Sequence, residues 1–407
     1  MTPPLPDPAS KLGEFFTEGR PTAAFVDLTA LGDNFTHLAA SLGTERELLA
    51  VVKAEAYGHG APEAAAAFVS AGARWLAVAT VEEAEALISG AVPNALGEAR
   101  VLVMSGALPV LAPRIALGGF DAVVWDMAQV EALAAAAASA GRITRVHVKI
   151  DSGMHRLGIA PGEAPDFFRR LGEMAGVEVA GLMSHLAQAD EEEGGEPTRE
   201  QFGIVRALMR ELEANGLLPP VIHTANSAGG IAYPEAPGSL VRAGIALYGC
   251  PPPGEAGAPL RPALTLKSAL IQIKAVPAGG AVGYGGTWRM KKPGRIAVVP
   301  IGYADGYPRI LSSRADVLVG GRRAPIAGRV SMDMLTVDVN EIADAAVGDE
   351  VVLIGAQGDG MIPCEELATR SHTITYEILS RLGSRVPRVF FEAGHITGHR
   401  NFGGGAA

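Results

Sequence analysis

Short β-rich runs alternate with helical patterns from about residue 22 to residue 250, and this alternation is what most constrains the fold of the chain. Nine runs are predicted as strands: 24–28, 48–53, 75–79, 101–104, 121–125, 145–150, 178–184, 220–223 and 239–242. The helices predicted between them include Thr29–Ser41, Pro62–Ala71, Val81–Ser89, Met127–Ala140 and Arg199–Asn215. Such alternation requires a parallel sheet, either closed into a (β/α)8 barrel or open and doubly wound. Nine strands are one too many for a barrel, so either the first belongs to another sheet or one of the nine is not a strand.

The pattern changes at the turn-rich stretch 250–254, CPPPG. Beyond it the β-branched runs are closely spaced and separated by Gly, Pro or Asp, at 264–276, 296–301, 316–319, 334–339 and 350–354, with little helix before 375–382. This spacing predicts a mostly-β domain. We therefore predict an N-terminal tail at 1–21, an α/β domain at 22–252 and a C-terminal mostly-β domain at 253–407.

Composition and charge exclude several classes of protein. The formal net charge of −10 over 407 residues argues against nucleic-acid binding and against a polybasic membrane surface. No apolar run reaches the roughly 20 residues needed to span a bilayer, and the first residues do not form a secretory signal. The two cysteines, Cys250 and Cys364, do not require a disulfide framework. We expect a cytoplasmic protein without a membrane or nucleic-acid partner, and no metal site is predicted.

Five polar side chains fall at the ends of predicted strands, where barrels bind their ligands. They are Lys53, Lys149, His185, His223 and Arg242. Each alone is more simply explained as a structural residue, for example a lysine whose amine extends to water. Five on one rim instead predict a basic mouth for a phosphorylated, anionic ligand. Burial would lower the pKa of Lys53 and make its amine a nucleophile, as a Schiff base with an aldehyde cofactor requires.

Residues 53–60, KAEAYGHG, resemble the lysine motif of the pyridoxal 5′-phosphate (PLP) dependent alanine racemases. Further segments resemble that family in the same order: 151–158 (DSGMHRLG), 223–230 (HTANSAGG), 241–249 (VRAGIALYG), 282–288 (VGYGGTW), 300–308 (PIGYADGYP) and 329–334 (RVSMDM). The matches run from about residue 22 to 390. The resemblance implies an N-terminal (β/α)8 TIM-type barrel followed by a C-terminal mostly-β domain, with PLP as the cofactor.

The resemblance also assigns contacts to the cofactor. Besides Lys53, the residues concerned are Tyr57, Arg156, His185, Ser227, Arg242, Gly244, Ile245 and Tyr376. Arg156 would contact the phenolic oxygen and the substrate carboxylate, although a loop arginine paired to a nearby acid is the simpler local explanation. Ser227 would bind phosphate, together with the N–H groups of Gly244 and Ile245. A helix cap without a ligand explains 226–227 equally well.

Arg242 would donate to the pyridine nitrogen of PLP. An arginine does not give up its proton at ordinary pH, so the ring stays a weaker electron sink, which favours racemisation over transamination. His223 and Asn226 would contact these cofactor-binding residues without touching the cofactor. Lys149 stands where many members of the family carry a carbamylated lysine, whose negative charge would orient Arg156.

Racemisation needs an acid or base on each face of the planar intermediate. Lys53 would serve one face. Tyr284 alone is more simply explained as a packing residue, but its Gly-rich context resembles the catalytic tyrosine loop of the family, which reaches the site of the partner subunit. Met332 would bind the substrate carboxylate through its N–H, beside Ser331, where the family often has Cys. Two complete sites would then require a head-to-tail homodimer, with Tyr284 and Met332 completing the partner's site.

The resemblance therefore implies an alanine racemase that interconverts L- and D-alanine by a two-base mechanism and supplies D-alanine for peptidoglycan. A broad-specificity or serine racemase of the same fold would share every motif. A non-enzymatic PLP-binding protein is a further alternative, against which the second domain with Tyr284 speaks.

Overall fold

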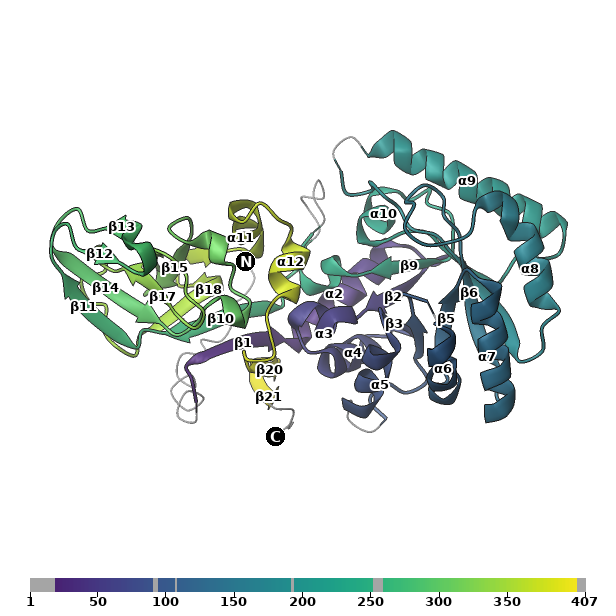
Figure 1. The fold of residues 1–407 in the computed structure, drawn as a ribbon, viewed down its shortest axis with the longest axis horizontal. Helices are drawn as coiled ribbons and strands as arrows, with labels where there is room; N and C mark the ends of the chain where they lie inside the picture. Colours follow the sequence, from purple (N-terminus) through teal and green to yellow (C-terminus); the bar gives the residue numbers. More distant parts are fainter. Residues whose placement is uncertain (1–18, 91–93, 107, 192–193, 252–258, 401–407) are drawn as a thin grey trace. The chain divides into compact units, whose positions relative to one another are not determined.

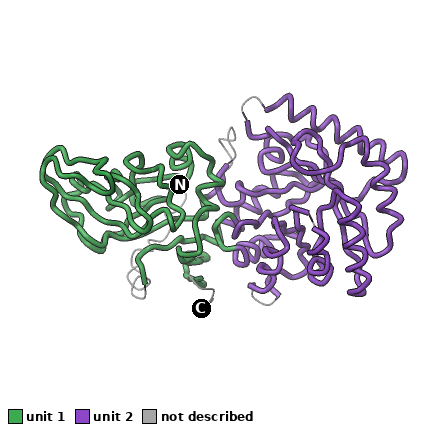
Figure 2. The backbone as a smooth tube through the Cα atoms, in the orientation of Figure 1, with its two compact units in different colours: residues 1–30, 57–60, 262–407 green, residues 31–56, 61–261 purple. Residues whose placement is uncertain are grey.

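The computed structural model describes residues 19–90, 94–106, 108–191, 194–251 and 259–400 (Figure 1). Most of the predicted tail at 1–21 and the predicted boundary at 252–253 lie outside these residues. The chain divides into two compact units (Figure 2). One unit comprises Leu31–Ala56 and Ala61–Arg261, and the other comprises Met1–Ala30, Tyr57–Gly60 and Pro262–Ala407. We call them the barrel unit and the β unit.

The barrel unit contains an eight-stranded parallel sheet. Its strands are β2 (Glu47–Val51), β3 (Trp75–Val78), β4 (Arg100–Val103), β5 (Asp121–Val124), β6 (Thr144–Lys149), β7 (Val177–Met183), β8 (Val221–His223) and β9 (Leu240–Ala243). They pair in the order β8-β7-β6-β5-β4-β3-β2-β9. Ser239, just before β9, donates its N–H to the Ile222 carbonyl in β8 at 2.9 Å, so the sheet nearly closes on itself. A (β/α)8 barrel is therefore formed, and not the open sheet.

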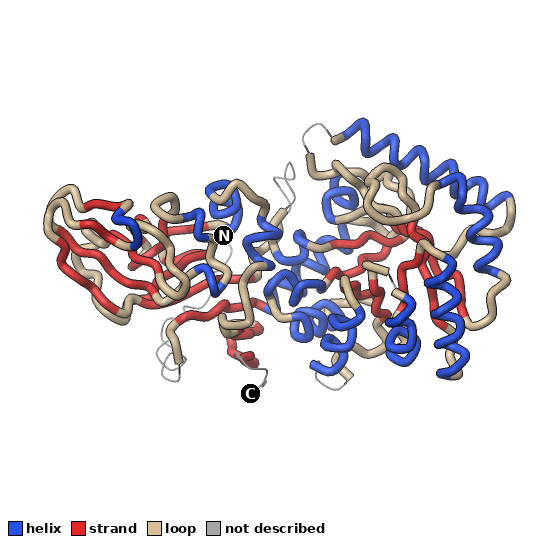
Figure 3. Tube along the Cα trace, in the orientation of Figure 1, coloured by secondary structure: helices blue, strands red, loops and turns tan. Residues whose placement is uncertain are grey.

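Helices surround the strands of this unit (Figure 3). They are α2 (Leu28–Ser41), α4 (Ala61–Ser70), α5 (Val81–Gly90), α6 (Ala112–Gly118), α7 (Met127–Ala140), α8 (Ala164–Gly172), α9 (Gly195–Ala214) and α10 (Ser227–Ala232). The five predicted helices are confirmed, with the largest difference at the start of α9. Sequence signals explain the ends of α7: Asp126 accepts from the Ala128 N–H at 2.8 Å, and Gly141 ends the helix with φ 62°.

The first predicted strand does belong to another sheet. β1 (Thr22–Asp27) pairs antiparallel with β10 (Leu264–Ala269) and parallel with β20 (Arg388–Glu392) in the β unit. This sheet runs in the order β16-β15-β18-β10-β1-β20-β21, and β19 pairs with β18. The other strands are β15 (Asp316–Val319), β16 (Arg322–Pro325), β18 (Glu350–Gln357), β19 (Gly360–Ile362) and β21 (His395–Arg400). Removing β1 from the count leaves the eight strands that a barrel requires.

The rest of the β unit departs from prediction in two places. The predicted run 264–276 is broken after β10, and its second half, β11 (Gln272–Val276), pairs instead with β14 (Gly294–Val299) and through it with β17 (Leu335–Asp338). β12 (Ala281–Val282) and β13 (Trp288–Arg289) form a hairpin. Helix α12 (Thr375–Ser380) is confirmed, but α11 (Cys364–Arg370) precedes it unpredicted. None of the helices in the described parts of the chain has the length and apolar character needed to cross a membrane.

Candidate active site

The five predicted rim residues lie at the C-terminal ends of the barrel strands. Lys149 and His223 are the last residues of β6 and β8, and Arg242 lies in β9. Lys53 and His185 follow two residues after β2 and β7. His223, Arg242 and Lys149 are buried, with exposed fractions of 0%, 3% and 7%, whereas Lys53 and His185 are partly buried. The parallel strands thus bring together side chains that are far apart in the sequence.

Arg242 is the most heavily hydrogen-bonded residue of the rim. Its Nη1 donates to the carbonyl of His223 at 2.6 Å and faces His223 Nδ1 at 3.2 Å. Its Nη2 donates to the Ser184 carbonyl at 2.8 Å, faces His185 Nδ1 at 3.0 Å and reaches the Thr224 carbonyl at 3.2 Å. Within the described residues its Nε–H has no acceptor, so one donor of a fixed guanidinium is left for a ligand. Burial lowers the pKa of Arg242 to about 9, and it stays charged at neutral pH.

The two rim lysines are electrostatically disfavoured as cations. Burial lowers the pKa of Lys53, and the charges of Arg156 and Arg242 lower it further, while Glu83 opposes the change. Burial, followed by the same two arginines, lowers the pKa of Lys149 to about 6. Both amines are therefore more nucleophilic at neutral pH than an exposed lysine.

Lys53 is followed by a left-handed turn. Element α3 (Lys53–Gly58) has φ values between 51° and 55° at Ala54, Glu55, Ala56 and Tyr57. Such a conformation costs roughly 1–2 kcal/mol for each residue other than glycine. Since strained backbone persists only where its surroundings over-determine it, the position of Lys53 is tightly specified.

Glu83 is a supporting residue that the sequence analysis missed. Its Oε1 accepts from the Ala54 N–H at 2.7 Å, and its Oε2 accepts from the N–H groups of Ala79 and Thr80 at 2.7 Å and 3.2 Å. The carboxylate thus ties the turn after Lys53 to the next strand–helix junction. The sequence signal for Glu83 was its spacing from Thr80 at the start of α5, which is that of a capping box. The structure contains this capping box, because the Glu83 N–H also donates to Thr80 Oγ1 at 3.3 Å.

Arg156 lies on a loop that is fixed at its base. The Asp151 N–H donates to the Ile159 carbonyl, and the Ile159 N–H donates to the Lys149 carbonyl, each at 2.9 Å. Asp151 Oδ1 accepts from the N–H groups of Gly153 and His155 at 3.1 Å and 3.0 Å. Arg156 itself is exposed and makes no ion pair with any described residue. The described residues therefore offer no example of the simpler explanation, pairing with an acid of a neighbouring helix.

In the segment predicted to bind phosphate, Asn226 and Ser227 make two different hydrogen bonds. Asn226 caps α10, because its Oδ1 accepts from the Gly229 N–H at 2.8 Å. Ser227 Oγ accepts from the Gly244 N–H at 2.8 Å, so this predicted phosphate donor is directed at Ser227 in the structure. Ile245 opens the 3-10 helix Ile245–Tyr248, where the first N–H groups have no acceptor within the helix.

The remaining predicted residues belong to the β unit. Tyr284 begins a short 3-10 helix between Gly283 and Gly285, whose φ values are 69° and 73°. Its side chain is 70% exposed, so it is not a packing residue of this chain. Tyr57 is buried, and its ring centroid lies 5.9 Å from that of Tyr376.

Met332 lies on a turn that Ser331 closes. Ser331 Oγ donates to the Met334 carbonyl at 2.6 Å and accepts from the Met334 N–H at 3.2 Å. The Met332 side chain is 52% exposed, and its N–H finds no acceptor in the described chain. Ser331 therefore supplies a hydrogen bond that shapes the turn presenting Met332.

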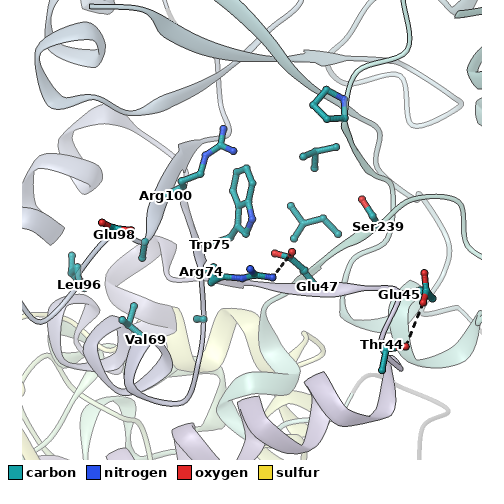
Figure 4. A pocket seen from close by; sticks show the side chains of 15 residues that line it. Thr44, Glu45, Glu47, Val69, Arg74, Trp75, Leu96, Glu98, Arg100 and Ser239 are labelled. Carbon is teal, nitrogen blue, oxygen red and sulfur yellow. Dashed lines mark hydrogen bonds and ion pairs between the residues drawn. The ribbon is translucent and has the colours of Figure 1, made fainter. Parts of the chain in front are cut away.

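A cavity lies at the opposite end of the barrel. It encloses about 690 Å³ at the N-terminal ends of β2, β3, β4, β8 and β9, and its wall includes Glu47, Trp75 and Arg100 (Figure 4). None of the predicted site residues lines it. It is therefore separate from the rim.

The fold and the rim define a (β/α)8-barrel protein with a cationic ligand site at the C-terminal ends of its strands. The alanine racemase N-terminal domain matches residues 26–252, and the alanine racemase C-terminal domain matches residues 263–390. The chain therefore belongs to the alanine racemase family, a family of isomerases. Presence of the C-terminal domain counts against the single-domain, non-enzymatic alternative.

Relatives of similar length carry the same name. The chain is 43% identical over 373 residues to the alanine racemase of Symbiobacterium thermophilum, covering 91% of this chain and 97% of that protein. It is 44% identical over 375 residues to the alanine racemase of Stutzerimonas stutzeri, covering 91% and 99%. Among solved structures, the alanine racemase from Bacillus anthracis with bound L-Ala-P has a TM-score of 0.87 at 35% identity, covering 94% of this chain and 98% of that one. The biosynthetic alanine racemase from Pseudomonas aeruginosa has a TM-score of 0.79 at 39% identity, covering 92% and 100%.

Proposed function

We propose that this member of the alanine racemase family interconverts L- and D-alanine in the cytoplasm with PLP bound at the barrel rim, and so supplies D-alanine for peptidoglycan. The observation that carries the proposal is the arrangement of Lys53 and Arg242. A partly buried amine with a lowered pKa lies at the same rim as a buried guanidinium whose Nε–H has no acceptor in the described residues.

The residues of the rim fit PLP in charge and hydrogen bonding. Lys53 would hold its aldehyde carbon, and Arg242 would direct Nε at the pyridine nitrogen. Ser227 and the Ile245 N–H would hold the phosphate, and a bound phosphate would have to share or replace the Gly244 N–H contact of Ser227. By family resemblance, Tyr57 and Tyr376 are further phosphate contacts, and Arg156 and His185 lie on the phenolic side. When bound, PLP would withdraw electrons from the substrate Cα and so acidify the proton there.

The chain's own residues would then move that proton. Lys53 Nζ takes or returns a proton at Cα on one face, and Tyr284 Oη does so on the other. Arg156 and the Met332 N–H hold the substrate carboxylate. Arg242 keeps its own proton, because the pKa of its guanidinium, although lowered, remains above neutral pH. It therefore limits how strongly electrons are withdrawn, which favours return of the proton to Cα.

Tyr284 and Met332 would act on the partner subunit of a head-to-tail homodimer. Their exposed fractions of 70% and 52% leave both side chains available on the surface of the β unit. A dimer in which each subunit lends these residues to the other would bury them and complete two sites.

Lys149 would carry a carbamate. Its amine is buried, has a pKa lowered to about 6 and has no hydrogen-bond partner within the described chain. An uncharged amine adds to carbon dioxide, forming a new N–C bond and releasing one proton. The product is an anion near Arg156 and Arg242, the two arginines that disfavour the charged amine.

Racemisation assays test the proposal. Purified protein with added PLP should convert L-alanine to D-alanine faster than it converts L-serine, L-arginine or L-lysine. Equal turnover of these amino acids would instead identify a broad-specificity racemase, and no turnover of any would refute the proposed function.

Tyr284→Phe tests the second base. In deuterated water this variant should slow exchange of the Cα proton of L-alanine much more than that of D-alanine, with PLP binding unchanged. The D-alanine reaction is the internal control. Equal slowing of both enantiomers, or none, would remove Tyr284 from the mechanism.

A further inference from the structure

A chain of buried polar side chains crosses the barrel interior from its N-terminal end to the rim. Asp121, the first residue of β5, has Oδ2 3.4 Å from His147 Nε2. His147 Nδ1 lies 2.9 Å from His223 Nε2, and His223 Nδ1 lies 3.2 Å from Arg242 Nη1. None of the four side chains is more than 3% exposed. Water therefore does not compete for these contacts, and their protons must be arranged among the four residues themselves.

The two ends of the chain dictate the direction of every hydrogen bond. A carboxylate only accepts and a guanidinium only donates. His147 must then donate from Nε2 to Asp121, and His223 must accept at Nδ1 from Arg242. Burial lowers the pKa of both histidines, so each carries a single ring proton. Only one arrangement satisfies all contacts: both rings are protonated on Nε2, and His223 donates from that nitrogen to His147 Nδ1.

A hydrogen bond from His147 and the charges of two arginines keep Asp121 in the carboxylate form. Although burial opposes ionisation, the pKa of Asp121 is lowered, because His147, Arg100 and Arg145 face it. Arg100 Nη2 lies 2.5 Å from Oδ2 and Arg145 Nε lies 2.9 Å from Oδ1. Arg100 is held in turn over the ring of Trp75, 4.0 Å from its centroid, on the wall of the cavity in Figure 4. The acceptor that starts the chain is therefore fixed in charge and in place.

We propose that Asp121 is a positioning residue for the rim: through His147 it fixes the Nε2–H tautomer of His223, which presents a lone pair to Arg242. With the opposite tautomer, an N–H of His223 would face an N–H of Arg242 across 3.2 Å. Arg242 would then have to turn, and its free Nε–H would turn with it. The proton arrangement does not depend on the proposed function, whereas its consequence for PLP does.

Asp121→Asn tests the assignment with little change in shape. Arg100 binds Oδ2 and Arg145 binds Oδ1, so one of the two arginines loses its acceptor in the amide. When that one is Arg100, the amide N–H groups occupy the Oδ2 position and face His147 Nε2. The wrong tautomer is the known effect of this change at a buried carboxylate–histidine pair. Both histidines should then move their proton to Nδ1.

Nitrogen NMR of the PLP-free protein labelled in its histidine rings reports this directly, because protonated and unprotonated ring nitrogens differ in chemical shift. We expect Nε2–H at both His147 and His223 in the unsubstituted protein, and Nδ1–H at both in Asp121→Asn. The control is Asp305→Asn, the same change at another buried carboxylate held by Arg20 and Arg385, which should move neither signal. An Nδ1–H tautomer of His147 or His223 in the unsubstituted protein would overturn the proposal.

His147→Gln keeps the test open if Asp121→Asn does not fold. A glutamine amide can donate to Asp121 and accept from His223, as the neutral imidazole does, so His223 should keep its Nε2–H tautomer. In His147→Leu the side chain offers His223 Nε2–H no acceptor, so His223 should no longer be held in the Nε2–H tautomer. The proposal fails if His223 has the same tautomer in both variants.

Binding of PLP separates this inference from the proposed function. Asp121→Asn should weaken PLP binding about tenfold, as expected for one misdirected hydrogen bond from a charged donor. A protein that shows the predicted tautomers but binds no PLP would refute the proposed function alone. Normal PLP binding by the unsubstituted protein with an Nδ1–H tautomer at His223 would refute the inference alone.

Discussion

The left-handed turn after Lys53 should reverse the usual effect of an alanine-to-glycine substitution. Ala54 has φ 52° and is exposed, so Ala54→Gly changes the backbone preference and removes almost no packing. Relief of the left-handed conformation is worth roughly 1–2 kcal/mol. The greater freedom of glycine in the unfolded chain costs about 0.5–1 kcal/mol. The net expectation is a barrel unit stabilised by up to about 1.5 kcal/mol.

Ala135→Gly is the matched control. Ala135 is also an exposed alanine of the barrel unit, but it lies within the ordinary right-handed helix α7. There the same substitution should destabilise by about 0.5–1 kcal/mol. Urea unfolding of both variants, followed by circular dichroism, measures the two changes in one unit. A loss of stability in Ala54→Gly as large as that in Ala135→Gly would refute the account of the turn.

Ala54→Gly should also separate stability from activity. A glycine next to Lys53 loosens a segment whose strain specifies where the amine lies. We expect slower racemisation in the more stable variant, with the hydrogen bond from residue 54 to Glu83 retained. Faster or unchanged turnover would mean that the turn does not position Lys53.

Two further predictions concern Lys149 and its loop. Unfolded Lys149 holds its proton up to its usual pKa of 10.5, whereas folded Lys149 releases it at about 6. The free energy of unfolding should therefore rise with pH between these two values in carbonate-free buffer. Lys149→Met should flatten the rise, and an equal slope in this variant would show that Lys149 is not buried as a neutral amine. Gly158→Ala should destabilise the loop that carries Arg156 by about 2–5 kcal/mol, because φ is 122° and the new Cβ would lie 2.7 Å from the Asp151 nitrogen. Gly162→Ala, where a Cβ meets nothing within 4 Å, is its control and should have little effect on the unfolding midpoint.

The sequence predicted the parts of the fold that follow from hydrophobic periodicity. Parallel strands separated by amphipathic helices were visible because each strand must be buried and each helix must cover it. Counting strands left two explanations for the ninth run, and the pairing of β1 with β10 and β20 decided between them. Periodicity gave no sign of the break between β10 and β11, because Leu270 and Ile271 continue the same β-rich pattern. The short helix α11 was not predicted for a similar reason, because it lies among closely spaced strands.

For the site, the sequence located residues at strand ends but not the contacts between them. The left-handed turn was invisible, because alanine and glutamate at 54–56 are ordinary formers of right-handed helix. Asp121 and His147 lie inside predicted strands, where side chains alternate between faces and the sequence does not tell which neighbours they meet. The Gly244 contact with Ser227 was also not predictable, since it joins two loops that only the closed barrel brings together.

The identity of the lysine that holds PLP is the most direct test of the account. Two rim amines with lowered pKa values, Lys53 and Lys149, compete for this role. Reduction with borohydride fixes PLP to the amine that holds it, and peptide mass spectrometry then locates the modified residue. The account predicts the adduct on Lys53. In Lys53→Ala, both the adduct and the visible absorbance of the bound cofactor should be lost, and the variant should form no D-alanine from L-alanine. An adduct on Lys149, or racemisation that survives Lys53→Ala, would contradict it.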